Sequence, residues 1–496
     1  MTIRKVLIAN RGEIALRISR ACRELGIEAV AVYSEADRLS PHVQEADEAY
    51  PIGPPPAAQS YLQAERLIEV ARRTHCDAIH PGYGFLAERA FFAQLVADAG
   101  LIFIGPPAAA IAAMGDKTEA RRRMIAAGVP IVPGVAEPLR DAAAARAAAE
   151  QFGYPVLLKA TAGGGGKGMR VVHGAAELER AFAAAQHEAQ AAFGDGSIYL
   201  EKYLARPRHI EIQVLADGHG NIVHLGERDC SVQRRHQKLI EEAPSPALTA
   251  ALRARMGETA VAAARAVDYR NAGTVEFLFQ DGEFFFLEMN TRIQVEHPVT
   301  ELVLGLDLVQ WQIRIAGGEP LPFEQAQLVP QGHALECRIT SEDPANSFLP
   351  STGRITLVEI PGGPGVRWDG AIAAGVDVSL FYDPLLGKLI THAADRTAAI
   401  DRMARALAEL RVVGVDTSVP FHRRVMQEPH FRSGDVTIRY LEEHAGLAQQ
   451  AATGETLLSA AVAAALLEEE ARTRRAAQRI AAQTGRVNAW RDRGWQ

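Results

Sequence analysis

The sequence predicts a multidomain α/β and α+β protein that begins with a doubly wound parallel sheet. Strand-like apolar runs alternate with helical periodicity through residues 6–104. This alternation is typical of a parallel sheet with helices on both faces. A glycine run between two apolar segments comes next, followed by a strongly apolar hairpin and dense polar segments. The length of 496 residues corresponds to about three domains of ordinary size.

Apolar runs and helical spacing set the elements expected in the first part of the chain. We expect strands at 6–9, 29–33, 78–80 and 101–104, and helices at 14–25, 61–73 and 91–99. Ligands of such sheets bind at the carboxyl ends of the strands. The loop at 10–13 does not follow the GxGxxG pattern, so no dinucleotide site is expected after the first strand.

Composition and charge argue against several classes of protein. Apolar residues make up 48% and charged residues 23% of the chain, as in soluble globular proteins. The net charge of -7 argues against a general nucleic-acid coat. The first residues lack the apolar core and small-residue cleavage site that a signal peptide has, and no run of about 18 apolar residues occurs, so we expect no membrane span. Four widely spaced cysteines indicate neither a disulfide framework nor a zinc site, which favours the reducing cytoplasm: Cys22, Cys76, Cys230 and Cys337.

The glycine run at 163–166 is the first strong functional signal. It lies between strand-like segments at 155–159 and 169–172, and Lys159 and Lys167 flank it. Glycines let backbone amides approach a polyphosphate closely, and the lysines add positive charge. The alternative is a flexible linker. No Ser or Thr follows the second lysine, so this is not a Walker A loop, and we expect a mobile flap that contacts phosphate.

A hairpin at 273–290 carries the candidate metal ligands. Its two apolar strands meet at Asp281 and Gly282, a favoured hairpin turn. Folding it about Gly282 places Glu276 opposite Glu288, with Asn290 on the same face as Glu288. Two facing carboxylates destabilise a sheet unless a cation neutralises them, and Mg²⁺ prefers oxygen ligands together with nucleotide phosphates. The alternative is an ordinary hairpin with two solvated glutamates.

Two polar segments flank this hairpin in sequence. In the segment at 290–298, Arg292 can hold an oxyanion, and Glu296 can act as a general base if burial tunes its pKa. The basic stretch at 227–238 would place His236 and Lys238 near anionic oxygens if the chain is extended there. A solvated loop and a solvated charged face are the respective alternatives.

Several of these stretches, taken together, resemble the biotin carboxylase family of the ATP-grasp group. They are the glycine run and residues 8–15, 80–86, 201–204, 228–238 and 288–297, and the resemblance covers about residues 3–445. It implies an ATP-grasp fold that holds the nucleotide between a lid and a larger domain. The implied parts are an N-terminal pre-ATP-grasp domain at 1–113, an ATP-grasp linker and lid at 114–203, the ATP-grasp core plus C-terminal biotin carboxylase domain at 204–445, and an Ala-rich helical tail at 446–496.

The resemblance also implies a role for each candidate site residue. Glu296 would deprotonate bicarbonate for attack on the γ-phosphate of ATP, and Arg338 would stabilise the biotin enolate. The implied catalytic set is Lys238, Arg292, Glu296 and Arg338. The implied bicarbonate site is Lys238, Arg292, Gln294 and the backbone of Val295. The implied ligands of Mg²⁺ or Mn²⁺ are Glu276, Glu288 and Asn290. The implied ATP contacts are Lys117, Lys159, Gly165, Gly166, Glu201, Lys202, Tyr203, Leu204, His209, Gln233, His236 and Leu278.

The implied activity is the ATP-dependent ligase step of an acetyl-, propionyl- or other acyl-CoA carboxylase, as in fatty acid metabolism, with ATP, Mg²⁺ and biotin as cofactors. Biotin acceptor domains carry a lysine in a Met-Lys-Met turn, and none of the eight methionines here precedes a lysine. We therefore expect biotin on a separate biotin carboxyl carrier protein or domain, unless the chain is part of a longer α subunit. A carboxyltransferase subunit is a further expected partner, and a homodimer or larger complex is expected.

Three other functions stay open: another ATP-grasp carboxylate–amine ligase, a pyruvate carboxylase subunit, and a non-catalytic nucleotide-binding scaffold. The joint presence of Lys238, Arg292, Glu296 and Arg338 argues against the ligase. The lysines, the metal ligands and the base argue against the scaffold. The glycine loop departs from parts of the family at Ala162 and Lys167, but its four central glycines remain.

Overall fold

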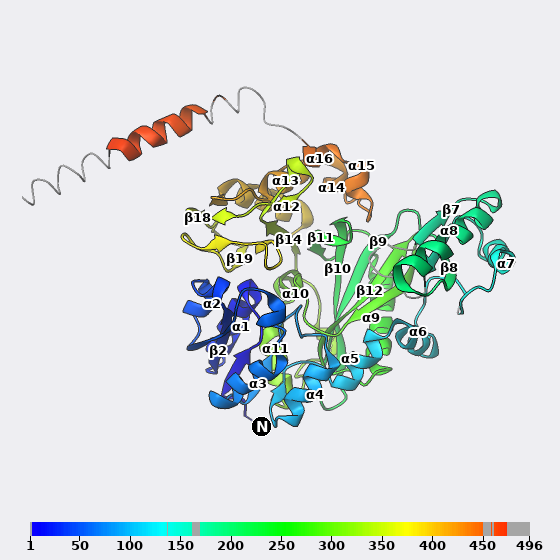
Figure 1. Cartoon of the computed structure of the whole chain (residues 1–496), viewed down its shortest axis with the longest axis horizontal. Helices are drawn as coiled ribbons and strands as arrows, with labels where there is room; N and C mark the ends of the chain where they lie inside the picture. The colour runs from blue at the N-terminus through cyan, green and yellow to red at the C-terminus, as the bar shows by residue number, and fades with distance from the viewer. Residues whose placement is uncertain (1, 136, 161–168, 450–457, 459–460, 474–496) are drawn as a thin grey trace, which may run out of the picture. The chain divides into compact units, whose positions relative to one another are not determined.

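A computed structural model describes residues 2–135, 137–160, 169–449, 458 and 461–473 (Figure 1). The contacts divide the chain into two units. The first comprises Met1–Pro344 and Phe348–Leu447, and the second comprises Ala345–Ser347 and Ala448–Gln496. The fold below is that of the first unit, because it contains every described candidate site residue.

The N-terminal part is a five-stranded parallel sheet in the order β3-β2-β1-β4-β5, which confirms the doubly wound prediction. Its elements are β1 (Lys5–Ile8), α1 (Gly12–Glu24), β2 (Glu28–Ser34), α2 (Pro41–Gln44), β3 (Glu48–Gly53), α3 (Ala64–Arg73), β4 (Ala78–His80), α4 (Ala90–Asp98) and β5 (Ile102–Phe103). Strand β3 was not predicted from the sequence. Its residues are mostly half-buried and include Pro51, which an edge strand tolerates.

An eight-stranded antiparallel sheet forms the centre of the unit, in the order β13-β12-β9-β10-β11-β14-β21-β19. Its strands are β9 (Arg208–Ala216), β10 (Ile222–Arg234), β11 (Gln237–Ala243), β12 (Asn271–Gln280), β13 (Glu283–Asn290), β14 (His333–Thr340), β19 (Val366–Gly370) and β21 (Leu385–Ala393). The sheet therefore joins residues of the predicted ATP-grasp core to residues near the C-terminal end of the unit.

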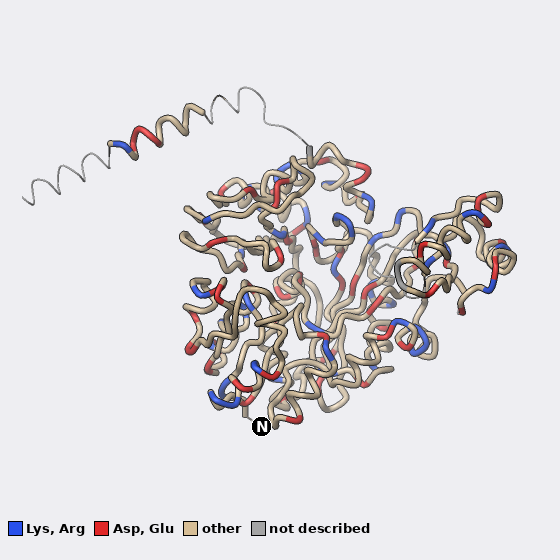
Figure 2. The backbone as a smooth tube through the Cα atoms, in the orientation of Figure 1, with Lys and Arg blue, Asp and Glu red and all other residues tan. Residues whose placement is uncertain are grey.

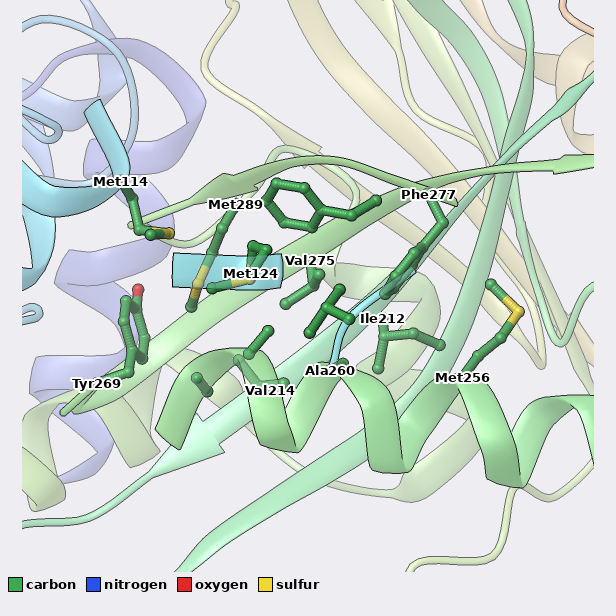
Figure 3. Packing of buried hydrophobic residues seen from close by; sticks show 14 of the residues in the cluster. Met114, Met124, Ile212, Val214, Met256, Ala260, Tyr269, Val275, Phe277 and Met289 are labelled. Carbon is green, nitrogen blue, oxygen red and sulfur yellow. The ribbon is translucent and has the colours of Figure 1, made fainter. Parts of the chain in front are cut away.

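The two faces of this sheet differ because side chains alternate along each strand. On one face, apolar residues of β9 and β12 pack with Met256 and Ala260 of α9 (Ala250–Arg265) (Figure 3). The labelled strand residues of that cluster are Ile212, Val214, Val275, Phe277 and Met289. The residues between them point to the other face, and they are His209, Glu211, Gln213, Thr274 and Glu276. A buried polar layer thus lies opposite the hydrophobic core.

A third sheet, in the order β7-β6-β8, forms the predicted lid with two helices beside it (Figure 1). Its elements are α7 (Ala142–Phe152), β6 (Val156–Ala160), β7 (Met169–Val172), α8 (Ala175–Phe193) and β8 (Ile198–Lys202). The glycine run, including Gly165 and Gly166, lies outside the described residues. The two strands that flank it are present, as the sequence predicts.

The remaining helices are α5 (Ala108–Gly115), α6 (Lys117–Ala126), α10 (His297–Leu304), α11 (Leu308–Ala316), α12 (Arg396–Glu409), α13 (Val419–Val425), α14 (Pro429–Ser433), α15 (Tyr440–Glu443) and α16 (Gly446–Gln449). The short strands are β15 (Glu342–Asp343), β16 (Leu349–Pro350), β17 (Gly353–Arg354), β18 (Leu357–Glu359), β20 (Asp377–Val378) and β22 (Arg411–Val413). Within the described chain, no helix is both long and apolar enough to cross a membrane.

The tail of the second unit is described at 461–473, where it is helical and almost entirely exposed. An Arg472–Glu468 ion pair of 3.4 Å supports the helix at a spacing of four residues. Of the rest of the predicted tail at 446–496, residues 446–449, which form α16, and residue 458 are described. The predicted domain boundaries near 113, 203 and 445 stay predictions.

Candidate active site

The buried polar layer converges on Lys238, which β11 places among three carboxylates. Its Nζ lies 2.5 Å from Glu211, 3.0 Å from Glu276 and 2.6 Å from Glu296. Burial opposes a charged lysine, but the three carboxylates hold the pKa of Lys238 well above its usual value. Figure 2 shows basic and acidic segments close together along the central strands. Lys238 therefore stays protonated and neutralises much of this layer.

Arg228 of β10 is the second buried cation of the layer, and it is fully buried. Its Nε donates to the carboxylate of Glu211. Its two terminal nitrogens donate to four further oxygens at 2.7 to 3.0 Å, those of Gln213, Thr300, Thr274 and Gln294. Since a guanidinium has five N–H donors, Arg228 is fully satisfied and fixes the positions of its partners.

The predicted carboxylate hairpin is present, and Glu276 pairs with Glu288. Its turn uses Asp281 at φ 54° and Gly282 at φ 82°, the left-handed conformation that an Asp-Gly hairpin turn requires. Phe277 pairs with Phe286, so the register shifts at the next residue pair. Leu287 is the extra residue of this bulge, and the bulge brings the two glutamates opposite each other.

Glu276 and Glu288 have different surroundings. Glu276 is buried and lies 3.0 Å from His209 Nε2, and it also accepts hydrogen bonds from Asn290 at 2.8 Å and Gln294 at 2.7 Å. Burial opposes its ionisation, but Lys238 and His209 keep the pKa of Glu276 far below its usual value. Glu288 is exposed, and desolvation together with the negative charge of Glu276 raises its pKa.

The donor set at this hairpin fits a hard divalent cation. Among the described residues, the carboxylate of Glu288 has no hydrogen-bond or ion-pair partner. It therefore presents an uncompensated negative charge beside Glu276 and the amide of Asn290. Carboxylate and amide oxygens are the ligands that Mg²⁺ and Mn²⁺ prefer. The structure thus brings the three predicted metal ligands together.

The predicted base, Glu296, lies just before α10, and Pro298 occupies the first turn of that helix. One of its oxygens contacts Lys238, and the other accepts a 2.8 Å hydrogen bond from Arg338 of β14. Burial opposes ionisation, but Lys238 and Arg338 hold the pKa of Glu296 well below its usual value. Nearby cations, rather than burial, therefore set its protonation state, and the group is an ionised carboxylate.

Arg292 and Val295 lie in the same segment. Arg292 is paired with Glu88 at 2.9 Å and also donates to Asn290 at 3.2 Å, so it lies beside the metal ligands. The carbonyl of Val295 accepts a 2.8 Å hydrogen bond from the fully buried Lys388. Of the predicted bicarbonate residues, Lys238 therefore contacts Glu296 directly, whereas Arg292 is linked to the hairpin through Asn290.

Several of the predicted ATP residues lie on two sheets. His209 of β9 and Leu278 of β12 are direct neighbours in the register of the large sheet. In the lid, Lys159 of β6 contacts Glu201 of β8 at 2.5 Å, and Arg121 contacts the same carboxylate at 3.2 Å. The ion pair therefore keeps the side chains of Lys159 and Glu201 next to each other on the lid sheet.

The remaining predicted ATP residues differ from one another in their contacts and in their exposure. Lys202 directs its side chain to the carbonyls of Gly153 at 2.7 Å and Tyr154 at 3.2 Å, so its ammonium is engaged within the lid. Tyr203 and Leu204 follow β8 and are half-buried, and Gln233 of β10 is buried. Lys117 is exposed at the start of α6, where its charge opposes the rise in the pKa of Glu288.

One expectation about the basic stretch is wrong. The chain is not extended at His236, because Arg235 and His236 form the two-residue turn between β10 and β11 with φ of 49° and 66°. His236 is exposed at this turn, whereas Lys238 lies on the following strand. The two residues therefore do not line one strand face together.

Sequence reasoning missed several carboxylates and cations of the site. Glu211 contacts both Lys238 and Arg228, and Glu241 accepts a 2.6 Å hydrogen bond from Arg338. A signal for Glu211 exists, because polar residues alternate with apolar ones along β9. No comparable local pattern indicates Glu241, since its partner comes from a strand distant in sequence.

Family models match almost the whole first unit. The biotin carboxylase N-terminal domain matches residues 2–111, the ATP-binding domain of the carbamoyl-phosphate synthase L chain matches residues 116–324, and the biotin carboxylase C-terminal domain matches residues 336–443.

Individual relatives match over the same span. The biotin carboxylase of Nostoc sp. is 54% identical over 444 residues, which cover 89% of this chain and 99% of the relative. A pyruvate carboxylase subunit of Methanothermobacter thermautotrophicus is 52% identical over 440 residues, covering 89% of this chain and 90% of the relative. A crystal structure of the biotin carboxylase domain dimer of Hydrogenobacter thermophilus 2-oxoglutarate carboxylase, with MgADP, ADP and bicarbonate, is 49% identical at a TM-score of 0.83, covering 91% of this chain and all of that one.

The matches agree with the geometry of the site. They confirm the ATP-grasp fold and the predicted enzyme class, an ATP-dependent biotin carboxylase. With three family models in order along the chain and a relative 54% identical over nearly its entire length, the chain belongs to the biotin carboxylase family.

Proposed function

We propose that the cluster around Lys238 is where bicarbonate reacts with the γ-phosphate of ATP. The observation that carries this proposal is that Glu296 is held ionised between Lys238 and Arg338, next to the carboxylate hairpin. Such a carboxylate can take a proton from bicarbonate, and the surrounding cations can stabilise the negative charge that develops.

ATP would lie between the lid and the large sheet. Lys117, Lys159 and His209 would contact it, with His236, Gln233 and Leu278 completing the contacts from the large sheet. The segment 201–204 would receive the adenine, and Gly165 and Gly166 would lie against the phosphates. Phosphoryl transfer depends mainly on positioning and charge neutralisation, which these groups supply.

Glu276, Glu288 and Asn290 would hold Mg²⁺ or Mn²⁺. When bound, the ion neutralises phosphate charge and helps orient the γ-phosphate for in-line transfer. Glu276 is already fixed by four protein contacts, whereas the carboxylate of Glu288 has no partner in the described part of the chain. Glu288 is therefore the ligand whose charge the ion compensates most.

Bicarbonate would be held by Lys238, Arg292 and the backbone of Val295. Glu296 removes its proton, and a bicarbonate oxygen attacks the γ-phosphorus, which forms carboxyphosphate and releases ADP. Carboxyphosphate then breaks down to CO₂ and phosphate. Gln294, also predicted for this anion, is engaged by Arg228 and Glu276, so its part is to fix the segment on which the anion rests.

Biotin would be carboxylated beside Arg338. As the ureido nitrogen attacks CO₂, negative charge develops on the ureido oxygen, and a fixed guanidinium stabilises it. Nε and Nη2 of Arg338 are engaged by Glu241 and Glu296. Among the described residues, Nη1 has no acceptor, so it is the group we assign to the biotin oxygen.

The wider assembly follows from the family. Biotin would arrive on a biotin carboxyl carrier protein or domain, and a carboxyltransferase subunit would pass the carboxyl group to acetyl-, propionyl- or another acyl-CoA. Pyruvate is the alternative acceptor, because one relative belongs to a pyruvate carboxylase. We propose a homodimer, as in the related Hydrogenobacter structure. Four free, buried cysteines favour the reducing cytoplasm.

A bicarbonate-dependent ATPase assay with and without free biotin tests this function. We expect ATP hydrolysis to require bicarbonate and Mg²⁺, and to accelerate when biotin is added. ATP turnover that is indifferent to both bicarbonate and biotin would instead favour a carboxylate–amine ligase.

A further inference from the structure

Three buried carboxylate oxygens next to the site have no partner among the described residues. They are Oε2 of Glu241 and both oxygens of Glu336. Glu241 and Glu336 are both completely buried. Leaving a buried polar group unsatisfied destabilises a fold, and more so if the group is charged, so such a cluster calls for an explanation.

The register of the sheet explains why these oxygens occur together. Glu241 of β11 lies directly opposite Glu336 of β14 in an antiparallel pair. Directly opposite side chains on one face are close neighbours. Two ionised carboxylates in that arrangement, both away from water, would repel each other strongly, so one of them must hold a proton.

The charges around the pair decide which carboxyl is neutral. Desolvation raises the pKa of Glu241 to about 7, but Glu241 accepts a 2.6 Å hydrogen bond from Arg338, which favours its ionised form. Glu336 has no such bond, and burial raises its pKa well above the usual value in spite of Lys388 on β21 and Arg338. The proton therefore belongs to Glu336, and its natural acceptor is the unpartnered Oε2 of Glu241.

We propose that Glu241 is a positioning residue for Arg338, and that Glu336, as a neutral acid, donates its carboxyl proton to Oε2 of Glu241 and holds it in place. This proposal rests on the role of Arg338 toward biotin put forward above. One hydrogen bond from Glu336 to Glu241 would satisfy two of the three unpartnered oxygens. The third, the carbonyl oxygen of the neutral Glu336, carries no charge and is the least costly of them to bury.

Two carboxylates hold the guanidinium of Arg338, and they differ in their roles in the proposed reaction. Glu296 holds Nη2 at 2.8 Å, but in the proposed reaction Glu296 also accepts the proton of bicarbonate and then loses its negative charge. Glu241 takes no part in that proton transfer, and its contact with Nε remains. The guanidinium therefore stays aimed at biotin through the interval in which its contact with Glu296 weakens.

The test compares two activities of the same full-length protein, bicarbonate-dependent ATP hydrolysis without biotin and carboxylation of free biotin. In Glu241→Gln we expect kcat for biotin carboxylation to fall about 10- to 100-fold, since hydrogen bonds to charged groups contribute about 1.5–3 kcal/mol. We expect a much smaller fall in ATP hydrolysis, so the ratio of the two rates drops. General structural damage would lower both rates together and would overturn the proposal, as would an unchanged ratio.

Two substitutions of Glu336 test the proton. Glu336→Gln keeps a donor toward Glu241, so the ratio should stay within about threefold of the wild type, whereas Glu336→Leu removes the donor, so the ratio should fall as in Glu241→Gln. Equal effects of the glutamine and leucine variants would contradict a neutral, donating Glu336.

Two further variants serve as controls. Glu242 follows Glu241 on β11 and pairs with Arg396 of α12, so Glu242→Gln should lower thermal stability but keep the ratio. Arg338→Ala should lower the ratio more than Glu241→Gln. If Arg338→Ala leaves the ratio unchanged, the proposed role of Arg338 fails. If only Glu241→Gln leaves it unchanged, the positioning inference alone fails.

Discussion

Replacing Arg228 by methionine should both destabilise the chain and disable the site. The guanidinium of Arg228 is fully buried and donates five hydrogen bonds from the centre of the polar layer. Methionine fills a similar length but offers no donor. Glu211 then loses its guanidinium partner and keeps Lys238 at 2.5 Å and the more distant His209 at 3.8 Å, while Gln294 loses the contact that fixes its carbonyl.

The magnitude follows from the charge that is left behind. Removing one partner of a buried ion pair costs about 3–5 kcal/mol, because the other charge stays buried. Glu211 retains Lys238, so we expect a loss at the lower end, about 3 kcal/mol. That is a large fraction of the total stability of about 5–15 kcal/mol that is typical of a folded protein.

Chemical denaturation measures the loss in the free energy of unfolding, and the rate of bicarbonate-dependent ATP hydrolysis measures the activity of the site. Arg354→Met is the matched control, because Arg354 is exposed and its side chain pairs with the exposed Asp377 at 2.9 Å and 3.0 Å. We expect the control to unfold at the wild-type midpoint. If Arg228→Met also unfolds there and keeps full turnover, Arg228 does not organise the polar layer, and the reasoning is refuted.

Further predictions concern the metal ligands, the base and acid stability. Glu288→Gln should raise the Mg²⁺ concentration for half-maximal ATPase activity without changing the unfolding midpoint, because the side chain is exposed; an unchanged Mg²⁺ dependence would exclude it as a ligand. Glu296→Gln should lower bicarbonate-dependent ATP hydrolysis by about 10²- to 10⁴-fold while nucleotide binding, followed by calorimetry, persists. Although burial opposes ionisation, hydrogen bonds from His333 and Arg396 lower the pKa of Glu242 to about 2 from 4.5. Its stabilisation is therefore complete above pH 4.5 and is lost as the pH falls toward 2, and unfolding midpoints of Glu242→Gln should be less sensitive to pH in that window.

The parts of the site that are local in sequence could be predicted from it. Asp281 and Gly282 fix a tight turn, and the alternation of the two strands then places Glu276 near Glu288. The bulge at Leu287 was not predicted, because it depends on how β13 packs rather than on a turn signal. The turn alone would set a register in which Glu276 and Glu288 are not directly opposite. The extra residue of the bulge shifts that register by one, which pairs the two glutamates.

The contacts that hold the catalytic groups in place could not be predicted in the same way. Glu211, Lys238 and Arg338 come from β9, β11 and β14, and the order of these strands in the sheet is set by packing between distant segments. Glu241 became visible only when β11 was paired with β14. Single-sequence patterns report the period of one strand, and they carry no information about which strand lies next to it.

Isotope transfer from bicarbonate to phosphate tests the central claim most directly. If Glu296 activates bicarbonate for attack on the γ-phosphorus, one bicarbonate oxygen becomes the bridging oxygen of carboxyphosphate and stays with phosphorus when CO₂ leaves. Turnover with ¹⁸O-labelled bicarbonate and biotin in unlabelled water should therefore give phosphate that carries one ¹⁸O atom per ATP consumed. Unlabelled phosphate, formed at the same rate, would show that water attacks ATP and would contradict the proposed chemistry.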